Sequence, residues 1–325
     1  MESADRAERR LGFAVKVLGR PGLPSHDTRR WRSGPSVAVS IDALHRILDY
    51  LDDVGIRMYR LSSDFVPYAT HPDLPRFHRQ IEEHAVDLAR IGRYANRLDI
   101  RLSLHPSQYV VLNAKDEAIA DKSRRDIDVQ ARLLDALQQG PEAVVVLHVG
   151  GAYGDRRAAL ERFASSFERL SEPARRRLAV ENDETSFTIR DCLWIHERLG
   201  TPIVFDHQHH RLNPGGMSAR DAVRAAIQTW PPDVTPKIHF SSARLDGREI
   251  RRGKSVRIEP PLLRQHADFV DPWTFADLLH EIRDARCDVM IEAKAKDLAV
   301  LKLRSDLAAI GRADVLLEPG PPTAG

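Results

Sequence analysis

Residues 143–151 read AVVVLHVGG, a run of apolar and mostly β-branched residues that ends in a histidine and two glycines. Such a run is typical of a strand buried on both faces of a parallel sheet. A helix-period stretch follows at 155–170. The same order of strand and helix recurs along the chain, with strand-like runs at 11–17, 56–61, 99–104, 143–149, 177–181, 203–206, 236–240 and 288–291. These eight runs predict an α/β fold, a single (β/α)8 TIM barrel, and an open doubly wound sheet is the alternative with the same alternation.

Between the strands, apolar residues recur three and four positions apart, as they do on one face of a helix. The first such helix spans 41–51, and Ser40 is its expected N-cap. Gly140 and Gly200 are the expected helix stops after the third and fifth of these stretches. We expect one domain over residues 1–325, with 1–10 and 312–325 poorly ordered.

The composition is that of a globular protein, because 30% of the residues are charged and 42% are hydrophobic. The net charge of +2 argues against a uniformly basic nucleic-acid binder but does not describe how charge is distributed. Cys192 and Cys287 cannot build a disulfide framework. No apolar run is long enough to span a bilayer, and the N-terminus does not read as a secretory signal. We therefore expect a cytoplasmic protein, associated with the bacterial nucleoid, that has no membrane partner.

In a TIM barrel the carboxyl ends of the strands meet at one face, where catalysis takes place. Six successive predicted strands end there in His, His, Glu, Asp, His and Glu, and two more histidines follow close by. Buried carboxylates repel one another unless cations are present, and the mixed nitrogen and oxygen donors suit Zn²⁺ or Mn²⁺ better than Ca²⁺ or Mg²⁺. The sequence thus predicts a cluster of metal ions that can clamp a phosphodiester, with the candidate ligands His105, His148, Glu181, Asp206, His209, His239, His266 and Glu292.

Lys237 shares a strand face with His239, so its side chain also points towards the predicted cluster. It could be neutral, carboxylated into an anion or bound to a substrate phosphate, or it could simply neutralise nearby carboxylates. Two loops on the same face are rich in arginine and lysine, the first at 16–32 and the second at 243–258. The second loop contains the candidate DNA-binding residues Arg244, Arg248, Arg251, Arg252 and Lys254.

Several runs at the predicted strand ends together resemble the UV damage endonucleases. They are the runs 60–64, 104–109, 148–151, 181–183, 205–210, 237–242, 266–268 and 291–296, and the resemblance spans about residues 11 to 303. It implies a TIM barrel related to the endonuclease IV type of repair enzyme, with two or three divalent ions, usually Mn²⁺. The implied activity is a nick immediately 5′ to a lesion in damaged double-stranded DNA, made by a monomer, that leaves a 3′-hydroxyl and a 5′-phosphate.

The resemblance also implies roles for particular residues. Glu181 and Glu292 correspond to catalytic metal-bridging carboxylates, and Lys237 corresponds to a carboxylated lysine. Gln108 and Tyr109 match the pair that enters the duplex to probe the lesion. The first strand departs from the family, because it reads Gly12-Phe13 where Gly-Tyr is usual, and a nearby Asn is lost. We expect Phe13 to stack on a base, and the lesion range stays open.

Three alternatives share parts of this pattern. An abasic-site endonuclease would use the same metal chemistry. A sugar isomerase also surrounds metals with His, Glu and Asp on a TIM barrel, but it needs neither eight ligands nor two basic loops. A non-catalytic DNA-binding descendant should have lost ligands, and none is missing from the sequence.

Overall fold

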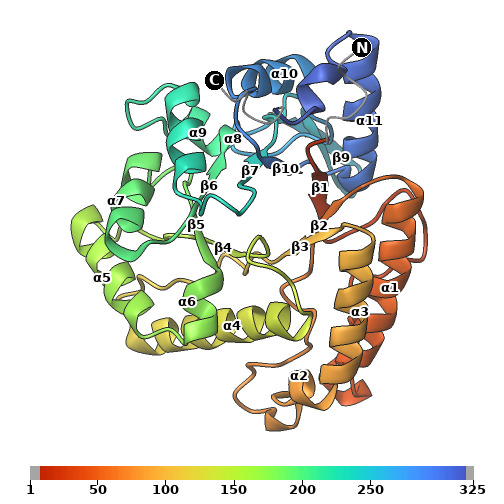
Figure 1. The fold of residues 1–325 in the computed structure, drawn as a ribbon, viewed down its shortest axis with the longest axis vertical. Coiled ribbons are helices and arrows are strands. Elements are labelled where there is room, and N and C mark those ends of the chain that lie inside the picture. Colours follow the sequence, from red (N-terminus) through yellow and green to blue (C-terminus); the bar gives the residue numbers. More distant parts are fainter. Residues whose placement is uncertain (1–7, 320–325) are drawn as a thin grey trace.

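The computed structural model describes residues 8–319 and confirms a barrel of parallel strands surrounded by helices (Figure 1). Its strands run in the order β3-β2-β1-β10-β7-β6-β5-β4. Leu104 closes the ring, because its backbone bridges in parallel to Val145 in the neighbouring strand. The open-sheet alternative is therefore wrong. The barrel strands are β1 (Leu11–Ala14), β2 (Met58–Arg60), β3 (Arg101–Ser103), β4 (Val145–His148), β5 (Leu178–Glu181), β6 (Ile203–Asp206), β7 (Lys237–Phe240) and β10 (Asp288–Ile291).

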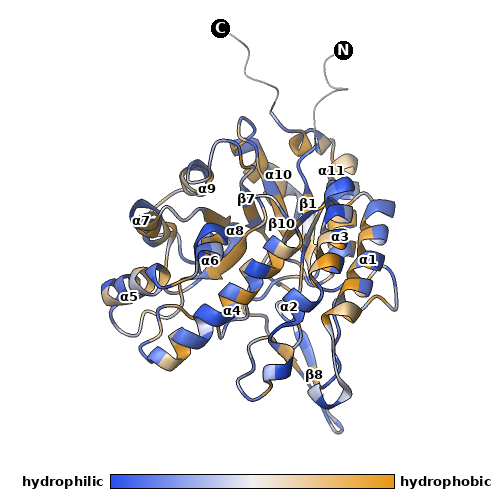
Figure 2. Cartoon of the chain, turned by 60° about the horizontal axis from the view of Figure 1, so that its bottom comes forward, coloured by the Kyte–Doolittle hydropathy of each residue, from blue (hydrophilic) through white to orange (hydrophobic). Residues whose placement is uncertain are grey.

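Helices pack around this barrel with their apolar faces inward. Figure 2 shows the contrast, since the central strands are mostly hydrophobic while the helices carry both kinds of residue. On the first helix the buried positions include Val37, Leu44, Leu48 and Leu51, which follow helical spacing. The helices are α1 (Val37–Asp53), α2 (Gln80–Glu83), α3 (Ala85–Arg97), α4 (Glu117–Ala136), α5 (Arg156–Glu168), α6 (Glu172–Arg177), α7 (Ile189–Leu199), α8 (His207–Leu212), α9 (Ala219–Gln228), α10 (Pro272–Glu281) and α11 (Lys296–Ala309). None of these described helices has the length and apolar character that crossing a bilayer requires.

An ion pair closes the amino-terminal end of the barrel. Arg101, at the start of β3, places Nη1 2.8 Å from Oδ2 of Asp288, at the start of β10, and both side chains are 1% exposed. The guanidinium also donates to the backbone carbonyl oxygens of Glu142 and Thr235, which precede β4 and β7. Because these bonds join four strands at one end, they hold the barrel on which the opposite, carboxyl-terminal face is built.

Two helix boundaries differ from the sequence-based prediction. The N-cap of α1 is Ser36, whose side chain accepts a hydrogen bond from the Ala38 backbone, and not Ser40. Ser40 is buried inside the helix, where its hydroxyl accepts from the backbone of Asp27. Gly200 ends α7 in the left-handed conformation, as predicted, whereas α4 ends before Gly140 because Gln138 adopts the positive φ of 51°.

The chain ends also depart from expectation. Residues 8–10 and 312–319, expected to be poorly ordered, contact each other, because Glu8 bridges to Leu317 and the buried Arg9 donates to the Val315 carbonyl. Residues 1–7 and 320–325 lie outside the described residues. The first strand ends at Ala14 and not at 17, because Val15 turns the chain with a φ of 67°.

The sequence did not predict a hairpin after β7. The loop after β7 forms an antiparallel hairpin of β8 (Arg248–Arg252) and β9 (Ser255–Glu259). These two strands make a sheet of their own, separate from the barrel.

Candidate metal centre

Seven of the eight predicted ligands lie together at the carboxyl-terminal face of the barrel. They form three groups, each with ligand atoms within 4.8 Å of one another: His105, His148 and Glu181; Glu181, Asp206 and His209; Asp206, His239 and Glu292. Glu181 belongs to the first two groups, and Asp206 belongs to the last two. These two carboxylates are therefore each within reach of two groups, whereas Glu292 belongs to one.

Glu181 is the centre of this arrangement, and its side chain is 1% exposed. Its Oε2 lies 3.0 Å from Nε2 of His105 and 3.6 Å from Nε2 of His148. Its Oε1 lies 2.9 Å from Nδ1 of His239 and 3.6 Å from Nδ1 of His209. Four histidines from four separate segments of the chain therefore converge on one carboxylate.

The eighth predicted ligand, His266, lies at the edge of the centre. Its Nδ1 is 3.9 Å from Oε2 of Glu292 and donates to the Glu292 backbone carbonyl. The same kind of bond orients two other rings, since His105 Nδ1 donates to the carbonyl of Pro106 and His209 Nδ1 donates to that of Asn182, both over 3.0 Å. A carbonyl partner fixes the proton on Nδ1 and leaves Nε2 free as a metal ligand.

The centre is electrostatically unsatisfied by protein atoms alone. Burial raises the pKa of Asp206 to about 6, with the charges of Glu181 and Glu292 adding to the effect. Burial lowers the pKa of His209, but the nearby carboxylates outweigh it and bring the value to about 9. Asp206 Oδ2 and His239 Nε2 are buried without a hydrogen-bond partner. Since buried polar atoms are nearly always paired, these donor atoms fit divalent cations.

Lys237 lies at the start of β7, two residues before His239, and is fully buried. Its Nζ has no hydrogen-bond partner among the described residues. Burial, together with the positive charges of Arg101 and Arg60, holds the pKa of this amine well below its usual value. Burial therefore disfavours the charged form of this amine.

Sequence reasoning missed three polar neighbours of the centre. Arg60, at the end of β2, forms an ion pair with Glu292. Glu184 places Oε2 3.9 Å from Nε2 of His209. Asn182 holds the backbone of Asp206 with both atoms of its amide, at 2.9 and 3.1 Å. The position of Arg60 at the end of β2 could have indicated that it lies near the centre, because the candidate ligands also follow strand ends. It was missed because arginine is not a metal-ligand residue type.

The residues predicted to contact DNA differ in their exposure to solvent. Gln108 and Tyr109 lie at the surface, and Tyr109 is 77% exposed. Phe13 is wholly buried and packs edge-on against Tyr59, with the ring centroids 5.4 Å apart. Phe13 is thus a core residue, because both faces of β1 are covered, and the expectation that its ring stacks on a base is withdrawn.

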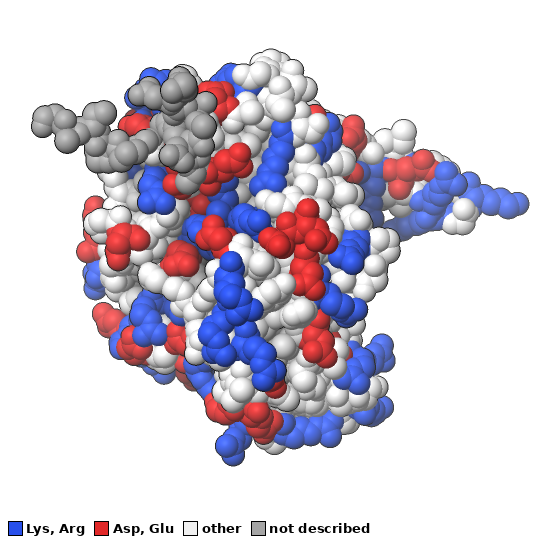
Figure 3. Space-filling model, turned by 45° about the vertical axis from the view of Figure 1, so that its right-hand side comes forward, with Lys and Arg blue, Asp and Glu red and all other residues white. Residues whose placement is uncertain are grey.

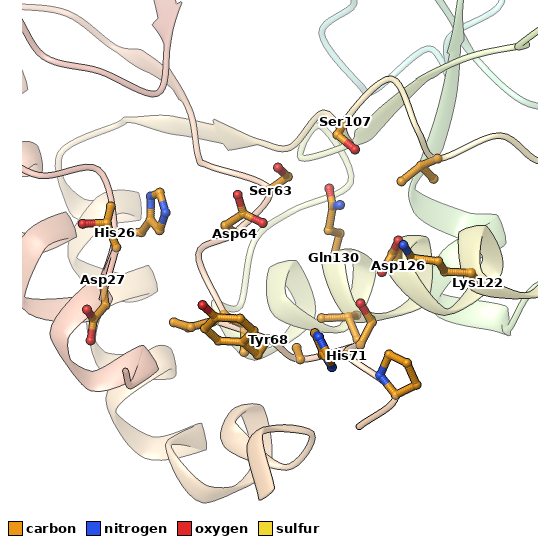
Figure 4. Close-up of a pocket in the computed structure, with 18 of the residues that line it drawn as sticks. His26, Asp27, Ser63, Asp64, Tyr68, His71, Ser107, Lys122, Asp126 and Gln130 are labelled. Atoms are coloured by element: carbon orange, nitrogen blue, oxygen red, sulfur yellow. The ribbon is translucent and has the colours of Figure 1, made fainter. Parts of the chain in front are cut away.

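A cavity of about 710 Å³ lies beside the loop that carries Gln108 and Tyr109 (Figure 4). Ser107 and Val110 flank that loop and line the cavity, which also receives Asp64 and Gln130. The Oε1 atom of Gln130 is buried without a hydrogen-bond partner. No candidate metal ligand lines this cavity, so it is distinct from the metal centre.

Fold and site together define a TIM-barrel protein whose clustered His, Glu and Asp side chains could hold divalent metal at the carboxyl-terminal face of its strands. A sequence model of the UV-endonuclease UvdE family matches residues 36–318, and the chain belongs to this family. It is 33% identical over 269 residues to a UV DNA damage endonuclease of Bacillus velezensis, which covers 82% of this chain and 79% of the relative.

One solved structure agrees with this assignment, and a second shares the fold alone. The crystal structure of SacUVDE superimposes with a TM-score of 0.77 at 27% identity, covering 94% of this chain and 99% of that one. A D-psicose 3-epimerase from Clostridium cellulolyticum H10 has a TM-score of 0.55 at 11% identity, covering 95% of this chain and 99% of the epimerase. At that identity the epimerase shares the fold alone, and it gives no support to the sugar-isomerase alternative.

Proposed function

We propose that the protein is a metal-dependent DNA repair endonuclease. In this proposal it hydrolyses the phosphodiester immediately 5′ to UV-type or other helix-distorting lesions and leaves a 3′-hydroxyl and a 5′-phosphate. The observation that carries the proposal is the sharing of Glu181 and Asp206 among three ligand groups in a chain of the UvdE family. Relatives named UV DNA damage endonuclease support the choice of substrate.

The proposed centre holds two or three divalent ions, Mn²⁺ first and Zn²⁺ as the second choice, on the eight predicted ligands. When bound, such ions supply Lewis-acid activation of water and offset negative charge on a phosphate. The protein contributes the arrangement of the donors. Backbone carbonyls orient His105, His209 and His266, while burial keeps bulk water from the carboxylates.

We assign Lys237 as the modified lysine. Its neutral amine nitrogen can attack carbon dioxide and release a proton, which forms an anionic carbamate beside the metal ligands. The burial of Nζ, its lack of a partner and its lowered pKa support this assignment. Arg60 is a positioning residue in the proposal, because its ion pair restrains the Glu292 carboxylate.

Gln108 and Tyr109 are the proposed lesion probe. An exposed tyrosine ring can fill the space left by displaced nucleotides and stack on their neighbours. The basic residues Arg244, Arg248, Arg251, Arg252 and Lys254 are proposed to contact the phosphates of damaged double-stranded DNA, which one copy of the chain binds.

A nicking assay tests the proposal. The purified protein is incubated with UV-irradiated, abasic and undamaged duplexes of one sequence, in Mn²⁺ and after chelation. We expect Mn²⁺-dependent cleavage 5′ to the UV lesion with ends that a DNA polymerase can extend. Cleavage of the abasic duplex alone would assign the chain to the abasic-site alternative, and metal-independent cleavage would refute the proposed centre.

A further inference from the structure

The hairpin of β8 and β9 stands apart from the rest of the molecule. Its strands pair only with each other, and eight of their ten residues are exposed, with Ile250 and Glu259 partly covered. Figure 3 shows it as a narrow projection covered largely by lysine and arginine. We call residues 248–259 the hairpin arm. Its two strands contribute nothing to the barrel core, so packing does not explain the sequence that it carries.

The charge of the arm is concentrated. It contains five basic and two acidic residues, a net charge of +3, whereas the whole chain carries +2. Both acids are paired within the arm, Glu249 with Arg251 and Glu259 with Arg257. Arg248, Arg252 and Lys254 form no ion pair with any described residue. These three cations are therefore free to meet an external polyanion.

The pairing register sorts the side chains onto two faces. Arg248 is opposite Glu259, Ile250 is opposite Arg257, and Arg252 is opposite Ser255, so these six residues share one face. Three arginines make this the arginine face. The other face carries Val256 and Ile258, which are 55% and 75% exposed, beside the paired Arg251 and Glu249.

The root of the arm is fixed to the metal centre. Ala243 bridges in an antiparallel way to His266, and the backbone of Arg244 donates to the Gln265 carbonyl over 2.7 Å. On the far side, the Lys294 backbone donates to the carbonyl of Ala267 over 3.0 Å. The arm therefore rises from the same barrel face as the ligands and is held at a defined position relative to them.

We propose that the hairpin arm is a DNA-binding β-ribbon. It lies in a groove of the intact duplex beside the lesion, with its arginine face towards the DNA. The inference rests on the proposed function and adds a second contact outside the cleavage site. Five-residue strands extend about 17 Å, which matches about five base pairs at roughly 3.4 Å each. A two-stranded ribbon fits the major groove, which is about 12 Å wide.

Binding to a 40-base-pair duplex with one central UV lesion, measured by fluorescence anisotropy across a KCl series, tests the arm. Each lost phosphate contact reduces the slope of log K against log salt by about 0.9. Arg248→Ala/Arg252→Ala should therefore lower the slope by about 1.8. The control Val256→Thr/Ile258→Thr alters the opposite face, and the control Arg46→Ala/Arg283→Ala removes the same charge from the outer surface. Both controls should keep the wild-type slope.

Duplex length gives a second readout. Wild type should lose affinity when the duplex on one side of the lesion is shortened until it no longer reaches the arm, and the Arg248/Arg252 variant should not. Nicking at low salt and saturating enzyme should persist in both control variants, because neither alters a candidate ligand or a basic residue of the arm. If wild type nicks normally and the slope of Arg248→Ala/Arg252→Ala is unchanged, the arm and the phosphate contacts of these two arginines are refuted. The proposed cleavage activity at the metal centre would then still stand. A wild type that nicks no damaged duplex would refute the proposed function itself.

Discussion

Replacing Glu181 by glutamine should remove two metal-binding groups at once. Glu181 is the only carboxylate of the first group and one of two in the second, whereas the third group does not contain it. Glutamine keeps the shape of the side chain but removes its negative charge. Loss of even an outer partner of a metal ligand costs about 10–100-fold in affinity. We therefore expect at least ~100-fold weaker binding at the first group, or about 2.8 kcal/mol at roughly 1.4 kcal/mol per tenfold.

Metal stoichiometry is the assay that isolates this effect. The variant is dialysed to equilibrium against micromolar Mn²⁺ and its metal content is measured by mass spectrometry. Glu181→Gln should retain only the ion of the third group, while His105→Ala, which belongs to the first group alone, should lose only one ion. Glu184→Gln is the matched control, because Glu184 lies near His209 but belongs to none of the groups. It should bind as wild type does.

The comparison can fail in a clear way. Equal metal content in Glu181→Gln and His105→Ala would show that Glu181 is not shared between ions. Nicking of UV-irradiated DNA should fall at least ~100-fold in Glu181→Gln, in step with metal content. Full nicking by a variant that lacks these ions would refute the role of the centre in cleavage.

Three further predictions concern other parts of the molecule. Arg101→Met leaves buried Asp288 without its main partner and should lower the free energy of unfolding in urea by about 3–5 kcal/mol; a change below about 1 kcal/mol would contradict this. Tyr109→Ala should reduce the preference for UV-damaged over intact duplexes in competition binding at constant metal content, and an unchanged preference would remove Tyr109 from the probe. Hydrogen bonds from Arg29 lower the pKa of Asp27 to about 2, whereas the pKa of an unfolded Asp is about 3.9. The ionised Asp27 carboxylate therefore stabilises the fold above a pH of about 3.9, and this stabilisation is lost as the pH falls towards 2. Asp27→Asn should flatten the dependence of unfolding free energy on pH in that window, and an equally steep dependence would assign the acid sensitivity to other groups.

The barrel and most of its centre were predictable because buried strands produce recognisable apolar runs in the sequence. A strand such as 145–148 is covered on both faces, so it reads as a continuous apolar run, and its end is marked by the first polar residue, His148. In a parallel barrel all such ends meet at one face. Six of the eight candidate ligands could therefore be located from the ends of six strands, without knowledge of the distances between them. His209 and His266 lie beyond the strand ends.

Phe13 and Ser40 are two residues whose environment the local sequence pattern did not predict. The sequence places Phe13 on a strand near the predicted centre, but only the neighbouring strand, with Tyr59, decides that its ring is enclosed. Ser40 has the chemistry of an N-cap, yet the helix begins one turn earlier at Val37, which is buried. In both cases the deciding contact comes from a residue distant in sequence or from the whole length of the apolar face.

The hairpin arm has no apolar pattern of this kind in its sequence, because neither of its faces is buried. Its strands alternate between two exposed surfaces, so hydrophobic periodicity is absent and the segment reads as a charged loop. The exposure of both faces also means that the charged residues of the arm are available to a binding partner. Packing does not explain five basic residues on an element whose strands are mostly exposed. A near-neutral chain that confines a net +3 to a two-stranded projection beside its acidic centre has the charge distribution of a protein whose partner is a long polyanion.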